Sequence, residues 1–239
     1  MSVPDSGERR AELAANLAAV QGRIAAACAA SGRRATEVQL IAVTKTFPVP
    51  DILILHELGI DDVGENKDQE AAPKVAACTA AGVTLRWHFV GQLQVNKAAS
   101  VASYAYMVHS VDRPRLVEAL GRRAVVAGRE LRCLVQVSLD SEAGRGGAEP
   151  REVPRLADAI GAREGLVLAG VMAVAPLGEP PRPAYARLRE IAETVRAAHP
   201  GAQVISAGMS GDLGEAIAEG ATHVRIGTAL LGGRQPFVR

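Results

Sequence analysis

One lysine stands where an amine could react with a carbonyl group. Lys45 follows the apolar run 38–43 and is itself followed by Pro48, which cannot donate a hydrogen bond to a sheet. A run of this length, rich in valine and isoleucine, is typical of a buried strand, so Lys45 is predicted at the strand's C-terminal end. A lysine partly removed from water loses some of its preference for the charged form and can become a Schiff-base nucleophile. The alternative is a lysine that simply extends from a strand end into water.

The choice of basic residues favours a chemical role for this lysine. The chain has 27 lysines and arginines, but lysine occurs at only four positions, which are Lys45, Lys67, Lys74 and Lys97. Arginine is therefore the ordinary basic residue of this sequence, and it cannot be deprotonated for nucleophilic attack. A lysine at a strand end is more easily explained by a need for its amine.

Two segments near the C-terminus have the composition of an anion site. Residues 206–213 leave a predicted strand through small residues and enter a helix, so backbone N–H groups near Met209 and the hydroxyl of Ser210 can converge on an anion. The next predicted strand carries Arg225 and ends in Gly227 and Thr228. Each segment is a weak signal alone, but the pair indicates a bound phosphate.

The elements between these residues follow a repeating pattern. From 8 to 30, apolar residues recur every three or four positions, which predicts a long amphipathic helix before the first strand. Short apolar runs then alternate with helical patterns, as in repeated βα units. Eight strands are predicted at 38–43, 61–64, 86–90, 107–110, 131–138, 167–171, 203–206 and 223–226, with helices at 50–58, 67–81, 96–101, 113–127, 150–160, 183–199 and 211–219.

This order predicts an α/β protein whose residues 1–239 form a single domain. The expected fold is one (β/α)8 TIM barrel over about 38–232, with an extra N-terminal helix at about 8–30. The loops after barrel strands meet at one mouth, and those after strands seven and eight commonly bind phosphate. A phosphate site facing a reactive amine points to pyridoxal 5′-phosphate (PLP). Arg225 would then meet the ring nitrogen and keep it unprotonated.

Other polar residues at strand ends allow more than one interpretation. Asn66 can offer a donor and an acceptor to a ligand, but Asn66 or Glu65 can equally cap the next helix. Asp112 is expected to cap the helix after the fourth strand, and His88 is expected to be a satisfied core histidine. Arg145, on a glycine-rich loop, could reach an anion or belong to a flexible surface loop.

The overall composition excludes several classes of protein. Charges nearly balance, giving a formal net charge of +1, so no electrostatic surface for nucleic acid or an anionic membrane is expected. The three cysteines are widely spaced and predict neither a disulfide framework nor a metal site. The polar N-terminus and the absence of an uninterrupted apolar run of membrane-spanning length predict a cytoplasmic protein without membrane insertion.

Seven motifs make the chain similar, over nearly all its length, to the YggS/PROSC family of pyridoxal phosphate homeostasis proteins. They lie at 42–46, 64–66, 87–91, 94–97, 109–112, 208–212 and 224–228. The resemblance implies a barrel of PLP fold type III, like the N-terminal domain of alanine racemase. It also implies a Schiff base at Lys45, with Asn66 near the cofactor. The other contacts that it implies are with the phosphate, from Met209, Ser210, Gly227 and Thr228, and with the ring, from Arg225.

Three positions differ from what is common in that family. Many relatives have lysine where this chain has Phe47, tyrosine where it has Lys67, and lysine where it has Arg145. These differences leave the phosphate motifs intact. They affect any transfer of PLP that passes the aldehyde to a second amine, because arginine does not normally form that imine.

The function expected from these observations is reversible storage or delivery of PLP by a monomer that is not an enzyme. PLP-dependent apo-enzymes are the expected recipients. A PLP-dependent amino-acid racemase is the alternative, but related racemases add a C-terminal β-domain, and only about ten residues follow Thr228. A Schiff-base aldolase acting on a sugar phosphate is a third possibility. It would explain the lysine and the phosphate loops, but it would not explain the family motifs.

Overall fold

Eight parallel strands close into a barrel in the computed structural model, which describes residues 6–139 and 146–233. Strands pair in chain order, and the last pairs with the first. They are β1 (Gln39–Val43), β2 (Asp62–Glu65), β3 (Arg86–Phe89), β4 (Met107–Val111), β5 (Leu131–Gln136), β6 (Leu166–Met172), β7 (Val204–Ser206) and β8 (His223–Ile226). The predicted TIM barrel is confirmed, and each strand lies within two residues of its predicted bounds. Arg145 lies outside the described residues.

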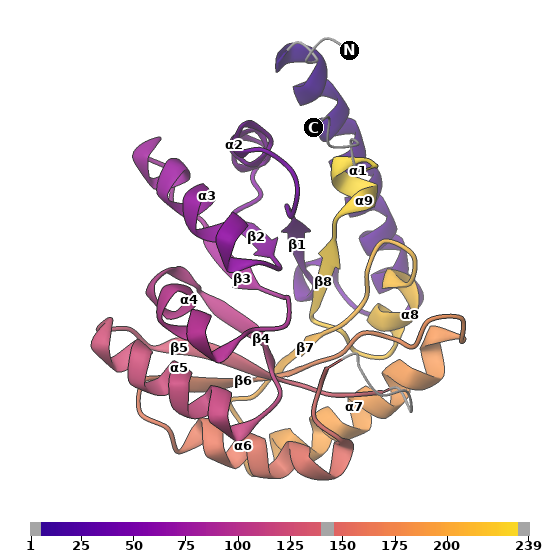
Figure 1. Ribbon diagram of the computed structural model, residues 1–239. Coiled ribbons are helices and arrows are strands. Elements are labelled where there is room, and N and C mark those ends of the chain that lie inside the picture. The colour runs from indigo at the N-terminus through magenta and orange to yellow at the C-terminus, as the bar shows by residue number, and fades with distance from the viewer. Residues whose placement is uncertain (1–5, 140–145, 234–239) are drawn as a thin grey trace.

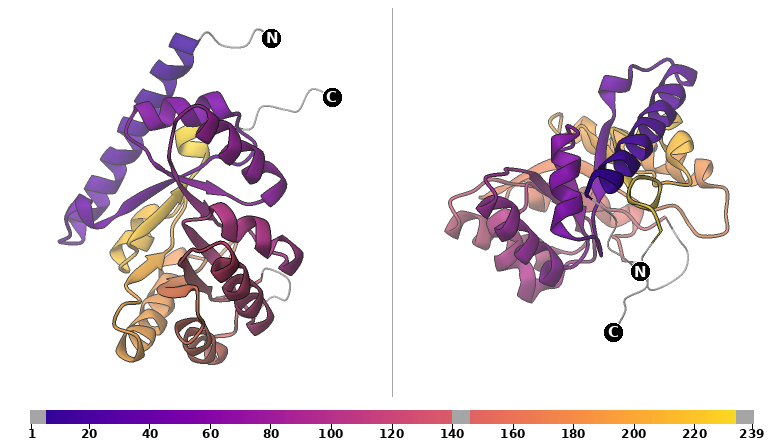
Figure 2. Two further views of the ribbon diagram at one scale, coloured as in Figure 1. Left: turned by 90° about the vertical axis from the view of Figure 1, so that its left-hand side faces the viewer. Right: turned by 90° about the horizontal axis from the view of Figure 1, so that it is seen from above.

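Helices surround the strands on the outside of the barrel (Figures 1 and 2). They are α1 (Ser6–Ala30), α2 (Val49–Glu57), α3 (Asp68–Ala80), α4 (Ala98–Tyr104), α5 (Pro114–Val126), α6 (Val153–Gly161), α7 (Pro181–Ala198), α8 (Leu213–Ala218) and α9 (Thr228–Leu231). Three short 3₁₀ segments, η1 (Ala35–Glu37), η2 (Val95–Lys97) and η3 (Pro150–Glu152), complete the order. The predicted helices are confirmed as α1 to α8. The segments η2 and η3 lie at the starts of the helices predicted at 96–101 and 150–160. The other two short segments, η1 and α9, were not predicted, because three or four residues show no period.

Successive side chains along each strand point to opposite faces, one toward the helices and one toward the barrel interior. In β1, Leu40 and Ala42 pack in the layer between strands and helices, and in β8 Val224 and Ile226 do the same. The residues between them, including Arg225, therefore face the interior. The fold thus places arginine and histidine side chains inside the barrel without exposing them to water.

The extra helix α1 packs beside α8 and α9, on the outside of β1 and β8 (Figure 1). Its periodic apolar side chains are buried there: Leu13, Leu17, Val20, Ile24 and Cys28. By length and composition alone, the segment Gly7–Ala30 is also long and apolar enough to cross a membrane, but one such helix near the N-terminus is weak evidence for a membrane span. In this fold its apolar side completes the layer outside the barrel.

Candidate functional site

Lys45 lies just beyond β1 at the C-terminal end of the barrel. Thr44 N–H donates to the carbonyl oxygen of Gly64 at 3.0 Å, so pairing with β2 continues one residue past the strand. By the alternation of β1, Lys45 shares the interior face with Ile41 and Val43. Its side chain is intermediate in exposure, and its amine contacts no hydrogen-bond or ion-pair partner among the described residues. The amine is therefore accessible to a ligand in the barrel mouth.

The backbone around Lys45 forms a tight turn with an unusual conformation. Phe47 N–H donates to the carbonyl oxygen of Thr44 at 3.0 Å, which closes a four-residue turn. Thr46, the third residue of that turn, has φ 69° and is the only residue other than glycine with positive φ in the described ranges. Type II turns need positive φ at this position and normally place glycine or asparagine there. Holding a β-branched residue in this conformation costs roughly 1–3 kcal/mol, so neighbouring contacts must stabilise the turn.

The loops after β7 and β8 meet at the same end of the barrel. Ala229 N–H, in the first turn of α9, donates to Ser210 Oγ at 3.2 Å. Gly227 lies beside β1, since a Cβ placed on it would be 3.4 Å from the carbonyl oxygen of Val43. The two predicted phosphate loops are thus in contact with each other, and the second adjoins the strand that ends at Lys45.

These two loops present backbone donors to the mouth. Within residues 6–139 and 146–233, the N–H groups of Ser210, Gly211, Gly227 and Thr228 have no hydrogen-bond acceptor. Met209 differs, because its N–H donates to Asp212 Oδ1 at 2.6 Å. Unbonded N–H groups on adjoining loops are the donors that a phosphate requires. Met209, which is 38% exposed as a residue, would approach a ligand through its side chain.

Gly208 sets the path of the first of these loops. It has φ 90°, and a Cβ at this position would lie 2.7 Å from the Cβ of Ala216. Gly211, three residues later, has no positive φ, and no atom lies within 4 Å of its Cβ position. The two glycines therefore offer a matched comparison within one loop.

We expect Gly208→Ala to destabilise the protein by roughly 1–3 kcal/mol, because alanine there is strained and collides with α8. The displaced loop should also bind an anion less well. Gly211→Ala should change the free energy of unfolding by less than about 0.5 kcal/mol. Urea denaturation of both variants measures the difference, and equal stabilities would contradict this account of the loop.

Arg225 is buried in the barrel interior, with 5% of its surface exposed. Its Nη1 donates to Ser206 Oγ at 2.7 Å, and its Nη2 donates to the carbonyl oxygen of Ala173 at 2.9 Å. Burial lowers the pKa of the guanidinium, while Tyr185 and Asp212 oppose that change. The guanidinium is thus fixed in orientation by two acceptors, one at the end of β7 and one directly after β6.

A chain of hydrogen bonds continues from this arginine through the barrel interior. His109 Nδ1 lies 2.9 Å from Ser206 Oγ, and His109 Nε2 lies 2.9 Å from His88 Nδ1. His88 Nε2 lies 2.8 Å from Asp62 Oδ1. Burial lowers the pKa of both histidines. The expectation that His88 is a satisfied core histidine is confirmed.

Asp62 closes this chain near the opposite end of the barrel. Burial alone would raise the pKa of its carboxyl group, but hydrogen bonds from Arg86 and His88 outweigh that effect and lower the pKa to about 2. Sequence reasoning did not connect these residues to Arg225. The alternation of β3, β4, β7 and β8 was the available signal, because it places their polar residues on one interior face.

Asn66 follows β2 at the mouth, and its backbone lies close to Gly91. A Cβ on Gly91 would be 2.1 Å from the carbonyl oxygen of Asn66, so only glycine fits there. The alternative in which Glu65 or Asn66 caps the next helix is wrong. The N-cap of α3 is Lys67, and no side chain caps it.

Asp112 and Lys67 are two other polar residues near strand ends. The predicted cap by Asp112 is wrong, since the N-cap of α5 is Arg113 and its first turn has no side-chain cap. The carboxylate of Asp112 instead accepts a hydrogen bond from the guanidinium of Arg113. Lys67 is largely exposed, with 66% of its side chain accessible, and pairs weakly with Glu70 at 3.8 Å.

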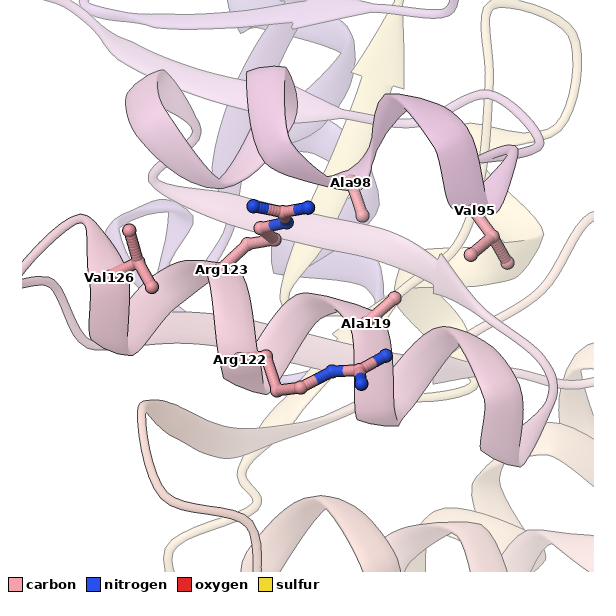
Figure 3. Close-up of a pocket in the computed structure, with 6 residues that line it drawn as sticks. All are labelled: Val95, Ala98, Ala119, Arg122, Arg123 and Val126. Atoms are coloured by element: carbon pink, nitrogen blue, oxygen red, sulfur yellow. The ribbon is translucent and has the colours of Figure 1, made fainter.

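A hollow of about 400 Å³ lies elsewhere, between α4 and α5 on the outside of the barrel (Figure 3). Its lining residues are Val95, Ala98, Ala119, Arg122, Arg123 and Val126. None of these belongs to the barrel mouth. Among the described residues, no group of three or more His, Cys, Asp or Glu side chains could hold a metal ion. The barrel mouth is therefore the place where an amine, a guanidinium and N–H groups that can donate to an anion come together.

Known proteins are similar to this chain in sequence and in fold. Residues 14–235 match the model of the family described as alanine racemase, N-terminal domain, which defines the class of barrel. The pyridoxal phosphate homeostasis protein of Mycobacterium tuberculosis H37Rv is 44% identical over 245 residues, which cover 95% of this chain and 95% of that protein. The Escherichia coli K12 protein of the same name is 37% identical, covering 93% and 97%. The chain belongs to the pyridoxal phosphate homeostasis protein family.

Solved structures show the same relationship. PipY of Synechococcus elongatus PCC7942, solved with PLP bound, superposes with a TM-score of 0.79 at 33% identity, covering 92% of this chain and all of that one. Alanine racemase from Streptomyces coelicolor superposes with a TM-score of 0.73 at 20% identity, over 92% of this chain but 58% of that one. The second likeness concerns the fold alone.

Proposed function

We propose that this protein binds PLP as a reversible Schiff base at Lys45, and that it stores or delivers the cofactor without a turnover reaction of its own. The observation that carries the proposal is the arrangement of the barrel mouth. An accessible amine follows β1. The two loops at the same end of the barrel carry four N–H groups, those of Ser210, Gly211, Gly227 and Thr228, without an acceptor within the described chain, and Arg225 is buried in the interior.

The chemistry assigned to each residue follows from its position. The uncharged amine of Lys45 adds to an aldehyde carbon, and loss of water leaves a C=N bond that water can reverse. Ser210, Gly227 and Thr228 would hold the phosphate through their N–H groups. Arg225 would direct a donor at the pyridine nitrogen, which disfavours protonation there and weakens the ring as an electron sink. Asn66 and the side chain of Met209 would border the cofactor.

The relatives support storage over turnover. Proteins matched over nearly their full length carry the name of a homeostasis protein, and PipY was solved with PLP. Alanine racemase is matched over 58% of its length and shares the fold alone. A weak electron sink fits a protein that keeps the cofactor unchanged better than one that stabilises a carbanion.

We further propose that the protein acts as a cytoplasmic monomer and that PLP-dependent apo-enzymes receive its cofactor. Supporting a reducing compartment, the three cysteines are all free and buried. The near balance of charge, at +1, offers no attraction to nucleic acid or an anionic membrane.

Transfer of PLP to an apo-enzyme tests the proposal. Protein loaded with PLP should restore the activity of the apo-enzyme, while assays on a panel of amino acids should show no racemisation above the rate with free PLP. A dialysis membrane between the two proteins separates delivery by contact from release into solution. Robust racemisation together with failure to restore the apo-enzyme would overturn the proposal in favour of a racemase.

A further inference from the structure

Helix α3 contacts the turn on both sides of Lys45. Glu70 Oε2 accepts a hydrogen bond from Thr46 N–H at 3.1 Å. Lys74 Nζ, one helical turn further on, donates to the carbonyl oxygen of Thr44 at 2.8 Å. The residues before and after Lys45 are thus tied to one helix, while its own amine is left accessible.

A buried ion pair fixes this part of α3 against the barrel. Lys74 Nζ lies 2.7 Å from Glu65 Oε1 at the end of β2, and Thr44 Oγ1 donates to the same oxygen at 2.7 Å. The exposed fractions of the Lys74 and Glu65 side chains are 12% and 1%. Removing one partner of such a pair leaves a buried charge, so the pair resists separation. Glu70 and Lys74 are four residues apart and share one face of α3. The ion pair that fixes Lys74 therefore also keeps Glu70 beside Thr46.

The conformation of Thr46 explains why this contact matters. A threonine at φ 69° is unfavourable on its own, whereas glycine adopts such values freely. In the described chain, the bond to Glu70 is the hydrogen bond that Thr46 N–H makes. Without it, the turn should relax toward ordinary φ values and carry Lys45 with it.

We propose that Glu70 is a positioning residue, which holds the strained turn so that the amine of Lys45 points at an aldehyde bound in the mouth. This inference rests on the proposed Schiff base at Lys45 and adds to it a residue of α3 that would not touch the cofactor. Its effect should appear in the rate of Schiff-base formation with a phosphate-bound aldehyde, because misplacement of a reacting group slows that step.

Three variants test the inference: Glu70→Ala, the double variant Thr46→Gly/Glu70→Ala, and Lys67→Ala as a control that removes only the weak ion pair to Glu70. The rate of Schiff-base formation with PLP is followed by absorbance in rapid mixing. Glu70→Ala should react about tenfold more slowly. The double variant should recover most of that loss, because glycine keeps the turn without Glu70. Lys67→Ala should react like the parent.

A second readout uses protein without PLP. Acetic anhydride is small and has no phosphate to fix it in the mouth, so acetylation of Lys45, measured by peptide mass spectrometry, should proceed equally in the parent and all variants. Slower acetylation of Glu70→Ala would mean that the substitution buries or charges the amine, which would contradict a positioning role. A parent that forms no Schiff base would overturn the proposed function and this inference together. A parent that forms one no faster than Glu70→Ala would overturn the inference alone, as would a double variant that recovers nothing.

Discussion

Lys45→Ala should abolish the imine absorption band that appears when the parent protein is loaded with PLP. Borohydride should then add no pyridoxyl mass to the peptide that contains position 45. Non-covalent PLP should still bind through the loops after β7 and β8, at least about tenfold more weakly, which corresponds to a loss of about 1.4 kcal/mol. Absorbance, reduction followed by peptide mass spectrometry, and equilibrium dialysis measure the three effects.

The scarcity of lysine makes this experiment easy to control. Only Lys67, Lys74 and Lys97 remain after the substitution, and Lys74 is held in its buried pair. Lys67→Ala and Lys97→Ala should each retain the full imine band. A band that survives in Lys45→Ala would move the reactive amine to another position, and complete loss of PLP binding would mean that the phosphate loops have been misassigned.

The barrel and the placement of its mouth could be predicted because they depend on local pattern. Valine-rich runs separated by helical periods predict βα units, and the carboxyl ends of their strands must meet. Lys45, Arg225 and the glycine-containing loops were therefore predicted at one end of the fold. The structure brings them there through the pairing of β1 with β8.

What holds the turn around Lys45 could not be predicted, because it depends on tertiary contacts. Threonine favours extended backbone, so nothing in the local sequence predicts positive φ at Thr46. Glu65 resembled a helix cap, but it belongs to β2 and pairs with a lysine on α3. One signal was available: Glu70 and Lys74 are four residues apart and therefore share a helix face. That spacing alone does not say which loop the face meets.

The interior histidines should make the protein sensitive to mild acid. Burial, together with His88 and Arg225, lowers the pKa of His223 to about 4, although Asp62 opposes this. An unfolded histidine titrates near 6.5, so the unfolded chain binds more protons than the folded one between these values. Stability therefore falls as pH drops from about 6.5 to 4. A shift of this size corresponds to roughly 3 kcal/mol from His223 alone, and the lowered pKa values of His88 and His109 act in the same direction.

Urea unfolding across this pH range should show the effect, and His223→Gln should reduce it. At pH 5 the variant should take up nearly one proton fewer on unfolding, which lowers the slope of stability against pH by about 1.4 kcal/mol per unit. The carboxyl group of Asp62 affects stability only at lower pH. Because its pKa is about 2 in the folded protein, its contribution is lost as pH falls from about 4 toward 2. A flat profile between pH 6.5 and 4 would therefore contradict the lowered pKa values of the histidines in the barrel interior.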